Sequence, residues 1–168
     1  YEETQNSTWM PRLGFENSYV IATREDYNAN NLTELAQVSQ EESLIFGSDH
    51  AYYERPVDGY DELLKTYSFK FSDSKTIDPN IMYDAVKNGD VDIITAFTTD
   101  ARIKAFNLKT YEDDKLFFPK YEAAPVVNND TLKAHPELEE LLAKLENMLT
   151  NELMMDMNAR VDAGEKAE

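Results

Sequence analysis

The sequence has no cysteine among its 168 residues, and it has only two histidines. Without cysteine there is no disulfide framework, no thiolate nucleophile and no thiolate metal site, so the redox compartment stays open. His50 and His135 are far apart in sequence, and neither has the spacing of a metal ligand. We therefore expect neither a bound metal nor a cofactor.

Long apolar runs and glycine-rich loops are also missing. No stretch approaches the roughly 20 apolar residues that a membrane-spanning helix needs, and no signal peptide opens the sequence. The chain has only five glycines, and none forms a loop that would cradle a phosphate, so nucleotide binding is unsupported. Because the sequence starts abruptly at Tyr1 and stops in a polar run at Glu168, we expect it to be a fragment of a longer protein.

Basic residues are few compared with acidic ones. The chain has 16 Lys and Arg residues against 33 Asp and Glu residues, which gives a formal net charge of −17. Contact with nucleic acid or with an anionic membrane surface is therefore electrostatically unfavourable. The plain interpretation is a solvated acidic surface, with attraction of cationic ligands as a secondary effect. The hydrophobic content of 42% is ordinary for a globular protein, with one sizeable core or two small lobes.

Strand and helix patterns alternate along the chain. Short runs rich in β-branched and aromatic residues predict strands, and capping residues before amphipathic stretches predict helices. The expected strands are Ser18–Thr23, Ser43–Gly47 and Val91–Phe97, and the expected helices begin near Asn31, at Asp58 and at Asp78. This alternation indicates an α/β domain with a mainly parallel sheet, in which ligands collect at the carboxyl ends of the strands. Phe97 lies at such an end.

The carboxyl-terminal part of the sequence predicts two helices. Pro136–Leu149 is strongly periodic, and a second helix is expected from Asn151 to about Val161, with Leu153, Met154 and Met157 as candidates for its buried face.

Two pairs of carboxylates invite an enzymatic interpretation, namely Asp90 with Asp92 and Asp113 with Asp114. Neither pair has a catalytic partner at a suitable spacing, so we expect no enzyme.

Two long motifs carry a family resemblance. They are Ala96-Phe97-Thr98-Thr99-Asp100 and Phe117-Phe118-Pro119-Lys120-Tyr121-Glu122-Ala123-Ala124-Pro125-Val126-Val127. The chain resembles the substrate-binding proteins of quaternary-ammonium ABC transporters, which deliver glycine betaine, carnitine, proline betaine and choline to an osmoprotectant permease. Further matching pieces are Leu13–Tyr19, Tyr53–Tyr60 and Tyr83–Asp92, so the resemblance covers nearly the whole chain from about Trp9 onward.

The resemblance implies a two-lobed α/β fold of the periplasmic-binding-protein-like (type II) class. Residues 18–119 would form the inserted second lobe, and residues 1–17 and 120–168 would form part of the first lobe. It also implies an extracytoplasmic protein, either a lipoprotein or a domain fused to its permease, with a small quaternary-ammonium ligand and a membrane permease as partners. The alternative is an isolated structural lobe or interaction module without ligand binding of its own. No feature of the sequence sets an oligomeric state.

The resemblance further implies the site residues. Tyr19, Phe97 and Tyr121 match positions of the family's aromatic box, although relatives often have tyrosine where this chain has Phe97, and a fourth box tyrosine has no counterpart here. Aromatic faces suit a cation that has no N–H donor. The plainer alternative is that these rings are ordinary core residues.

Arg55 matches the arginine that pairs with a ligand carboxylate, as a guanidinium fork can do with two hydrogen bonds. The alternative for Arg55 is an ion pair with Glu54 or Asp58. Thr98 and Thr99 are candidates for hydroxyl contacts with a ligand, but either of them would also serve as a helix cap. We expect Asp58 and Asp100 to start helices or fix loops.

Overall fold

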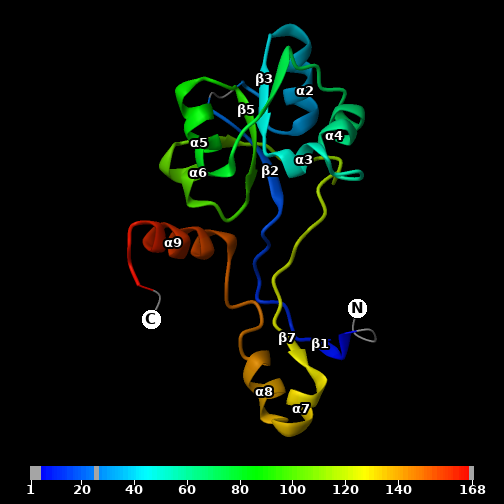
Figure 1. The fold of residues 1–168 in the computed structure, drawn as a ribbon, viewed down its shortest axis with the longest axis vertical. Coiled ribbons are helices and arrows are strands. Elements are labelled where there is room, and N and C mark those ends of the chain that lie inside the picture. The colour runs from blue at the N-terminus through cyan, green and yellow to red at the C-terminus, as the bar shows by residue number, and fades with distance from the viewer. Residues whose placement is uncertain (1–4, 25–26, 167–168) are drawn as a thin grey trace. The chain divides into compact units, whose positions relative to one another are not determined.

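The computed structural model describes residues 5–24 and 27–166, which form two compact units. Unit 1 comprises Tyr1–Ser18 and Lys120–Glu168, and unit 2 comprises Tyr19–Pro119. Figure 1 shows that unit 2 contains a sheet with helices around it, whereas unit 1 contains a short two-stranded ribbon and helices. Each unit is therefore built from its own secondary structure.

Unit 2 is organised around a five-stranded sheet with the order β4-β3-β5-β2-β6. Its strands are β2 (Tyr19–Thr23), β3 (Ile45–Ser48), β4 (Asp73–Thr76), β5 (Ile93–Phe97) and β6 (Lys109–Thr110). β3 is parallel to β4 and to β5, but β2 is antiparallel to β5 and to β6. Four of these five strands therefore point the same way, as expected of a mainly parallel sheet, and β2 runs opposite to them. A buried strand has a continuous apolar run whichever way its neighbour points, so the pattern does not reveal strand direction.

Helices cover both faces of this sheet. They are α2 (Leu32–Glu41), α3 (His50–Tyr53), α4 (Tyr60–Tyr67), α5 (Pro79–Asn88) and α6 (Ala101–Ala105), with α5 and α6 on one side of the strands and α2 and α4 on the other (Figure 1). The side chains of Ile93 and Ile94 are both fully buried, although only Ile93 belongs to the core cluster under α2 and α4. Successive residues of β5 therefore face opposite layers.

Two helices have the N-cap residue that the sequence predicts, and at two others the observed N-cap differs from a predicted one. Asn31 caps α2, and Asp78 caps α5, which ends at Gly89 in the left-handed conformation, as expected. Asp58 is not the cap of α4, because that position belongs to Gly59. Asp100, expected to start a helix or fix a loop, is the cap of α6 in place of Thr98 or Thr99, because its carboxylate accepts the backbone N–H of Arg102.

Unit 1 contains the strands β1 (Ser7–Trp9) and β7 (Val126–Asn128), which pair antiparallel, and the helices α7 (Asn129–Ala134), α8 (Glu137–Ala143) and α9 (Asn151–Asp162). The long helix expected over Pro136–Leu149 is wrong, since α8 ends at Ala143. The following segment binds another part of the chain instead: the N–H of Asn147 donates to the Arg12 carbonyl and the N–H of Leu149 to the Leu13 carbonyl.

Several apolar side chains of unit 1 are exposed, among them Trp9, Leu141, Leu145, Met148, Leu153 and Val161. The expected helix over Asn151–Val161 is confirmed as α9, but its predicted buried face is wrong for Leu153, which is 42% exposed. Met154 and Met157 are half-buried. In the part of the chain that the structure describes, no helix has the length and apolar character needed to cross a membrane.

Candidate functional site

Two aromatic rings meet at one end of the unit 2 sheet. Tyr19 is the first residue of β2, Phe97 is the last residue of β5, and the antiparallel register places them directly opposite each other. Their ring centroids are 4.8 Å apart with an angle of 31° between the ring planes. Directly opposite residues of an antiparallel pair have side chains on the same face of the sheet, so the two rings form one aromatic surface.

The ring of Tyr19 has further aromatic neighbours. Tyr52 of α3 lies 5.3 Å away and Phe118 lies 6.0 Å away, measured between ring centroids. Tyr52 and Phe118 are buried, whereas Tyr19 and Phe97 are half-buried. The buried rings thus support the two that reach the surface.

The backbone of Phe97 is hydrogen-bonded to a network of polar side chains. The backbone N–H of Phe97 donates to the Tyr83 hydroxyl at 3.4 Å, and Tyr83 is also hydrogen-bonded to the Asp100 carboxylate. The guanidinium of Arg102 binds both oxygens of Asp100 and lies 3.9 Å from the centroid of the Tyr83 ring. Burial, followed by the nearby Asp100 carboxylate, raises the pKa of the Tyr83 hydroxyl above its ordinary value. The hydroxyl therefore stays protonated at neutral pH.

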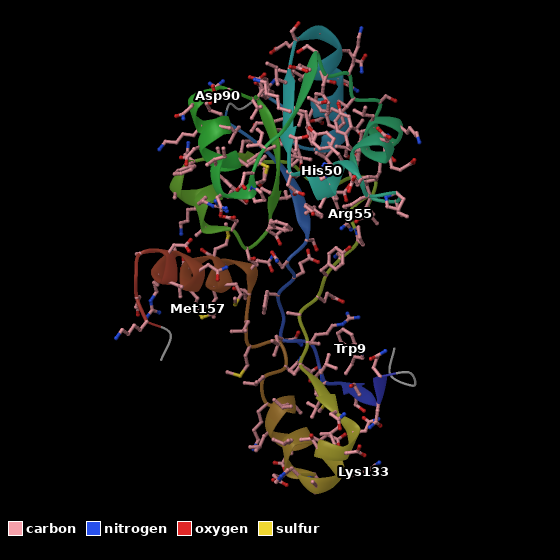
Figure 2. All side chains as sticks on the ribbon, in the orientation of Figure 1. Trp9, His50, Arg55, Asp90, Lys133 and Met157 are labelled. Carbon is pink, nitrogen blue, oxygen red and sulfur yellow. The ribbon has the colours of Figure 1, made fainter. Side chains whose placement is uncertain are left out.

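Arg55 lies in the turn between α3 and α4, on the chain segment marked in Figure 2 by the labels of Arg55 and His50. Its Nε donates to Asp58 Oδ1 at 2.8 Å and its Nη2 donates to Asp58 Oδ2 at 2.5 Å. The guanidinium carbon is 5.4 Å from the centroid of the Tyr19 ring. The structure therefore brings Tyr19, Phe97 and Arg55 together, and it also realises the alternative contact expected for Arg55, an ion pair with Asp58.

The turn that carries Arg55 depends on Gly59. A Cβ atom at this position would lie 2.3 Å from the carbonyl oxygen of Arg55 and 2.6 Å from that of Tyr52. Both distances are far below ordinary van der Waals contact, so only glycine allows the chain to fold back this closely. Asp58, 6% exposed, is thereby placed beside the guanidinium rather than at a helix cap.

The remaining predicted site residues lie elsewhere. Thr98 is half-buried in the turn that follows β5, where the N–H of Asp100 donates to the Phe97 carbonyl, and Thr99 is buried. Tyr121 belongs to unit 1, where it is 47% exposed and its N–H donates to the Ser18 hydroxyl at 3.0 Å. The place of Tyr121 in a site with Tyr19 and Phe97 stays a prediction.

Three of the four paired carboxylates, those of Asp92, Asp113 and Asp114, have structural partners. Asp113 accepts hydrogen bonds from the Tyr67 hydroxyl and from the N–H groups of Phe117 and Phe118. Asp114 accepts from both the N–H and the hydroxyl of Thr33. Asp92 accepts from the Ile45 N–H at 2.8 Å.

These bonds fix loops and strand ends. Within residues 5–24 and 27–166, no three His, Cys, Asp or Glu side chains are grouped as metal ligands.

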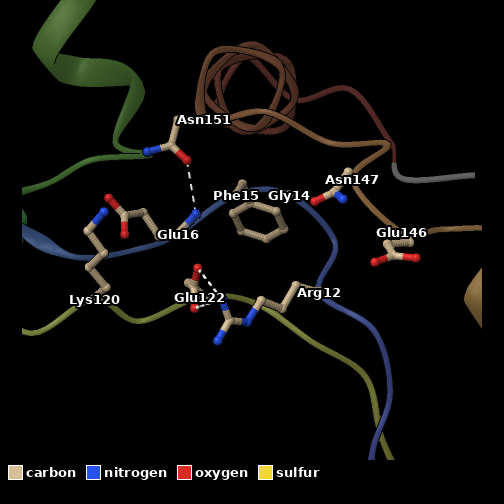
Figure 3. Close-up of a pocket in the computed structure, with 9 residues that line it drawn as sticks. All are labelled: Arg12, Gly14, Phe15, Glu16, Lys120, Glu122, Glu146, Asn147 and Asn151. Atoms are coloured by element: carbon tan, nitrogen blue, oxygen red, sulfur yellow. Dashed lines mark hydrogen bonds and ion pairs between the residues drawn. The ribbon is translucent and has the colours of Figure 1, made fainter.

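Unit 1 has a separate cavity of about 600 Å³ (Figure 3). Its described lining is largely polar: Arg12, Gly14, Phe15, Glu16, Lys120, Glu122, Glu146, Asn147 and Asn151. The guanidinium of Arg12 is paired with Glu122 at 2.7 Å, and Asn151 accepts the N–H of Glu16 at 2.9 Å. With Phe15 as its one aromatic ring, this lining offers less to a quaternary ammonium group than the paired rings of unit 2 do.

Comparison with known proteins decides the family. The family model described as the substrate binding domain of ABC-type glycine betaine transport systems matches residues 1–168. The chain belongs to this family. The match extends over the whole sequence and therefore includes both motifs around Phe97 and Tyr121 that carried the resemblance.

Among curated relatives of this glycine betaine substrate-binding family, the chain is 36% identical over 166 residues to the carnitine transport binding protein OpuCC of Listeria monocytogenes, covering 96% of this chain and 53% of the relative. It is 32% identical over 174 residues to a glycine-betaine-binding protein of Pseudomonas aeruginosa, covering 96% and 56%. The chain thus spans about half the length of these two relatives.

Solved structures agree. A crystal structure described as a glycine betaine/carnitine/choline ABC transporter matches 99% of this chain and 61% of its own, with a TM-score of 0.86 and 30% identity. Apo YehZ of Escherichia coli, at 23% identity and a TM-score of 0.71 over 97% of this chain and 62% of its own, supports the fold alone. The expected periplasmic-binding-protein-like α/β fold is confirmed. The expectation of a binding protein rather than an enzyme is confirmed too, because the family and these relatives are transport and binding proteins.

Sequence reasoning missed two members of the aromatic surroundings of Tyr19, namely Tyr52 and Phe118. Phe118 lies within a quoted motif, but nothing in the pattern separated it from its neighbour Phe117. Tyr52 lies in α3, shortly after a buried strand. A helix of four residues is too short for its hydrophobic pattern to show which side chains are buried. The pairing of Arg55 with Asp58 was one of the two ion pairs expected as the alternative for Arg55.

Proposed function

We propose that this chain is part of the extracytoplasmic substrate-binding component of an ABC importer and that it binds quaternary-ammonium osmoprotectants. The observation that carries the proposal is the contact of the Tyr19 and Phe97 rings at a sheet end with the Arg55 guanidinium beside Tyr19. Two π faces attract a cation that has no hydrogen-bond donor, and a guanidinium recognises a carboxylate.

The relatives support this ligand class by their names. Carnitine and glycine betaine each carry a trimethylammonium group and a carboxylate, and these are the ligands named for the Listeria and Pseudomonas proteins. Ergothioneine, named for a Helicobacter pylori permease and binding protein that is 35% identical over 171 residues, has the same two groups. We infer that Tyr19 and Phe97 face the ammonium group and that Arg55 faces the carboxylate.

The rest of the proposed site depends on the two lobes. Unit 2 would be the second lobe and unit 1 part of the first, with Tyr121 adding a ring and Thr98 a hydroxyl when the lobes close around the ligand. The closed form would then present the ligand to a membrane permease. Phe97 supplies an aromatic face without a phenolic oxygen, so the preference among glycine betaine, choline, carnitine and proline betaine depends on other polar groups.

Titration calorimetry tests this function. Glycine betaine and choline are titrated into the 168-residue chain and into the same chain lengthened by the amino-terminal lobe of the Listeria relative. We expect both ligands to bind the lengthened protein and to bind the 168-residue chain far more weakly, because the fourth tyrosine of the family's aromatic box has no counterpart among the 168 residues. Equal affinity of the two proteins would contradict the proposed division of the site, and no binding by either would overturn the ligand class.

The exposed apolar side chains of unit 1 favour a second candidate, an isolated structural lobe or interaction module. Met148 is 63% exposed and Leu141 is 52% exposed, and contact with a partner protein would remove such apolar surface from water. Under this alternative the chain would bind a protein partner through these residues and would bind neither ligand. The same calorimetric experiment separates the two candidates.

A further inference from the structure

Tyr52 has a hydroxyl group without a hydrogen-bond partner. The residue lies in α3, its side chain is 0% exposed, and its hydroxyl has no partner among the described residues. Buried hydroxyl groups in proteins nearly always have a partner, because an unmade hydrogen bond in an apolar interior is costly. The Tyr52 hydroxyl is therefore a buried donor that can take an acceptor when one comes within reach.

The groups around this hydroxyl include both members of the neighbouring ion pair. The centroid of the Tyr52 ring lies 5.3 Å from that of Tyr19, and the guanidinium carbon of Arg55, whose Nε binds Asp58, lies 5.4 Å from the same Tyr19 centroid. Burial raises the pKa of Tyr52 most, the Asp58 carboxylate raises it further, and the Arg55 guanidinium lowers it. The raised pKa keeps the hydroxyl protonated at neutral pH, and it can only donate to the carboxylate. Both oxygens of Asp58 are already engaged by the fork of Arg55.

A ligand carboxylate would compete for the same fork. A guanidinium binds a carboxylate best through two parallel hydrogen bonds, and here Asp58 already makes two such bonds to Arg55. Asp58 is buried, so a carboxylate that lost these bonds would have little access to water. It would need another donor close by, and the Tyr52 hydroxyl is a donor without an acceptor.

We propose that Asp58 exchanges partners when a zwitterionic ligand binds. The ligand carboxylate takes the Arg55 guanidinium, and the freed Asp58 carboxylate accepts a hydrogen bond from the Tyr52 hydroxyl. This proposal rests on the proposed function and deepens it, because it makes Tyr52 and Asp58 specificity-determining residues for ligands that carry a carboxylate. Choline has no carboxylate, so it leaves the pair of Arg55 and Asp58 intact.

The experiment compares Tyr52→Phe with the wild type, in whichever of the two proteins described above binds more tightly. Affinities for glycine betaine and choline are measured by calorimetry, and the melting temperature is measured without ligand. We expect the ratio of betaine affinity to choline affinity to fall about tenfold, as for the loss of one hydrogen bond to a charged acceptor. The melting temperature without ligand stays the same or rises, because the substitution removes an unpaired buried hydroxyl.

Tyr53→Phe is the matched control. The hydroxyl of Tyr53, the next residue of α3, donates to the Lys75 carbonyl at 3.0 Å and is therefore already paired. Its removal should lower the melting temperature and leave the ligand ratio unchanged. Tyr52→Phe should instead lower the ratio of betaine affinity to choline affinity and leave the melting temperature unchanged or higher. A residue with a purely structural role would not give this combination.

A second comparison uses Asp58→Asn, which removes the charge that competes for Arg55. In this background Tyr52→Phe should no longer change the affinity ratio. An unchanged ratio in Tyr52→Phe alone, or parallel losses for both ligands, would overturn the exchange. If the wild type binds both ligands, such a result leaves the proposed function standing. If the wild type binds neither, the function fails first and the exchange fails with it.

Discussion

Tyr19 and Phe97 lie directly opposite each other in neighbouring antiparallel strands, and their ring centroids are 4.8 Å apart. The first residue of β2 and the last residue of β5 thereby form one aromatic surface at a sheet end. The backbone N–H of Phe97 is bound by the Tyr83 hydroxyl, which fixes the end of β5. The ring positions thus follow from strand register and a buried network rather than from a mobile loop.

Phe97→Ala should weaken the binding of glycine betaine and choline alike. Each aromatic contact with a cation is worth about 0.5 to 2 kcal/mol, so the expected loss is roughly twofold to thirtyfold in calorimetric affinity. Tyr121→Ala should have a similar effect on both ligands. Phe106→Ala is the control, since the half-buried ring of Phe106 is paired with Lys87 at 4.3 Å and lies outside the aromatic surface. A loss for only one of the two ligands would contradict the assigned role.

Arg55→Ala should weaken glycine betaine binding much more than choline binding, because only betaine has a carboxylate. Arg55→Lys should recover only part of the loss, since an ammonium group keeps the charge but lacks the planar fork. Both variants are compared by calorimetry with the two ligands. If choline and betaine suffer equally from Arg55→Ala, the arginine is not a carboxylate clamp but a structural partner of Asp58.

Asp113→Ala should destabilise unit 2. The carboxylate accepts from the Tyr67 hydroxyl and from two backbone N–H groups, so its removal leaves several donors without an acceptor. We expect a loss of about 2 to 4 kcal/mol in the free energy of unfolding, measured in urea. Asp114→Ala is the control: this exposed carboxylate binds the N–H and the hydroxyl of Thr33, and its loss should cost about 1 kcal/mol. Equal losses in the two variants would show that the extra bonds of Asp113 add nothing.

The stability of unit 2 should fall in acid through Asp100. Burial by itself raises the pKa of this carboxyl, but hydrogen bonds from Arg102 and Tyr83 outweigh burial and hold the pKa below its ordinary value. A carboxyl whose pKa is lowered by folding stabilises the protein fully above its unfolded pKa of about 3.9, and this contribution disappears as the pH falls through the lower folded value.

Urea unfolding between pH 2 and pH 6, a range set by about two units on either side of that value, measures this dependence. Asp100→Asn should be less stable than the wild type at the upper end and should lose less stability on acidification. A slope identical to that of the wild type would mean that other carboxyl groups carry the acid sensitivity.

The sequence by itself determined the family, the α/β class and the helix ends whose signals are local. Asn31, Asp78 and Gly89 cap helices as expected because their partners lie within four residues along the chain. The motif around Phe97 likewise placed an aromatic residue at the end of a buried strand. Interactions of this range are present in any chain with the same local residues.

Only the tertiary structure decided features that depend on distant partners. The direction of β2 depends on its pairing with β5, and the end of α8 depends on the segment after it, which binds Arg12 and Leu13. Asp58 carries the same cap signal as Asp78, yet it pairs with Arg55, because Gly59 lets the chain fold back tightly at that turn. Local signals name the candidates for a contact, and long-range packing selects among them because most buried polar groups need a partner.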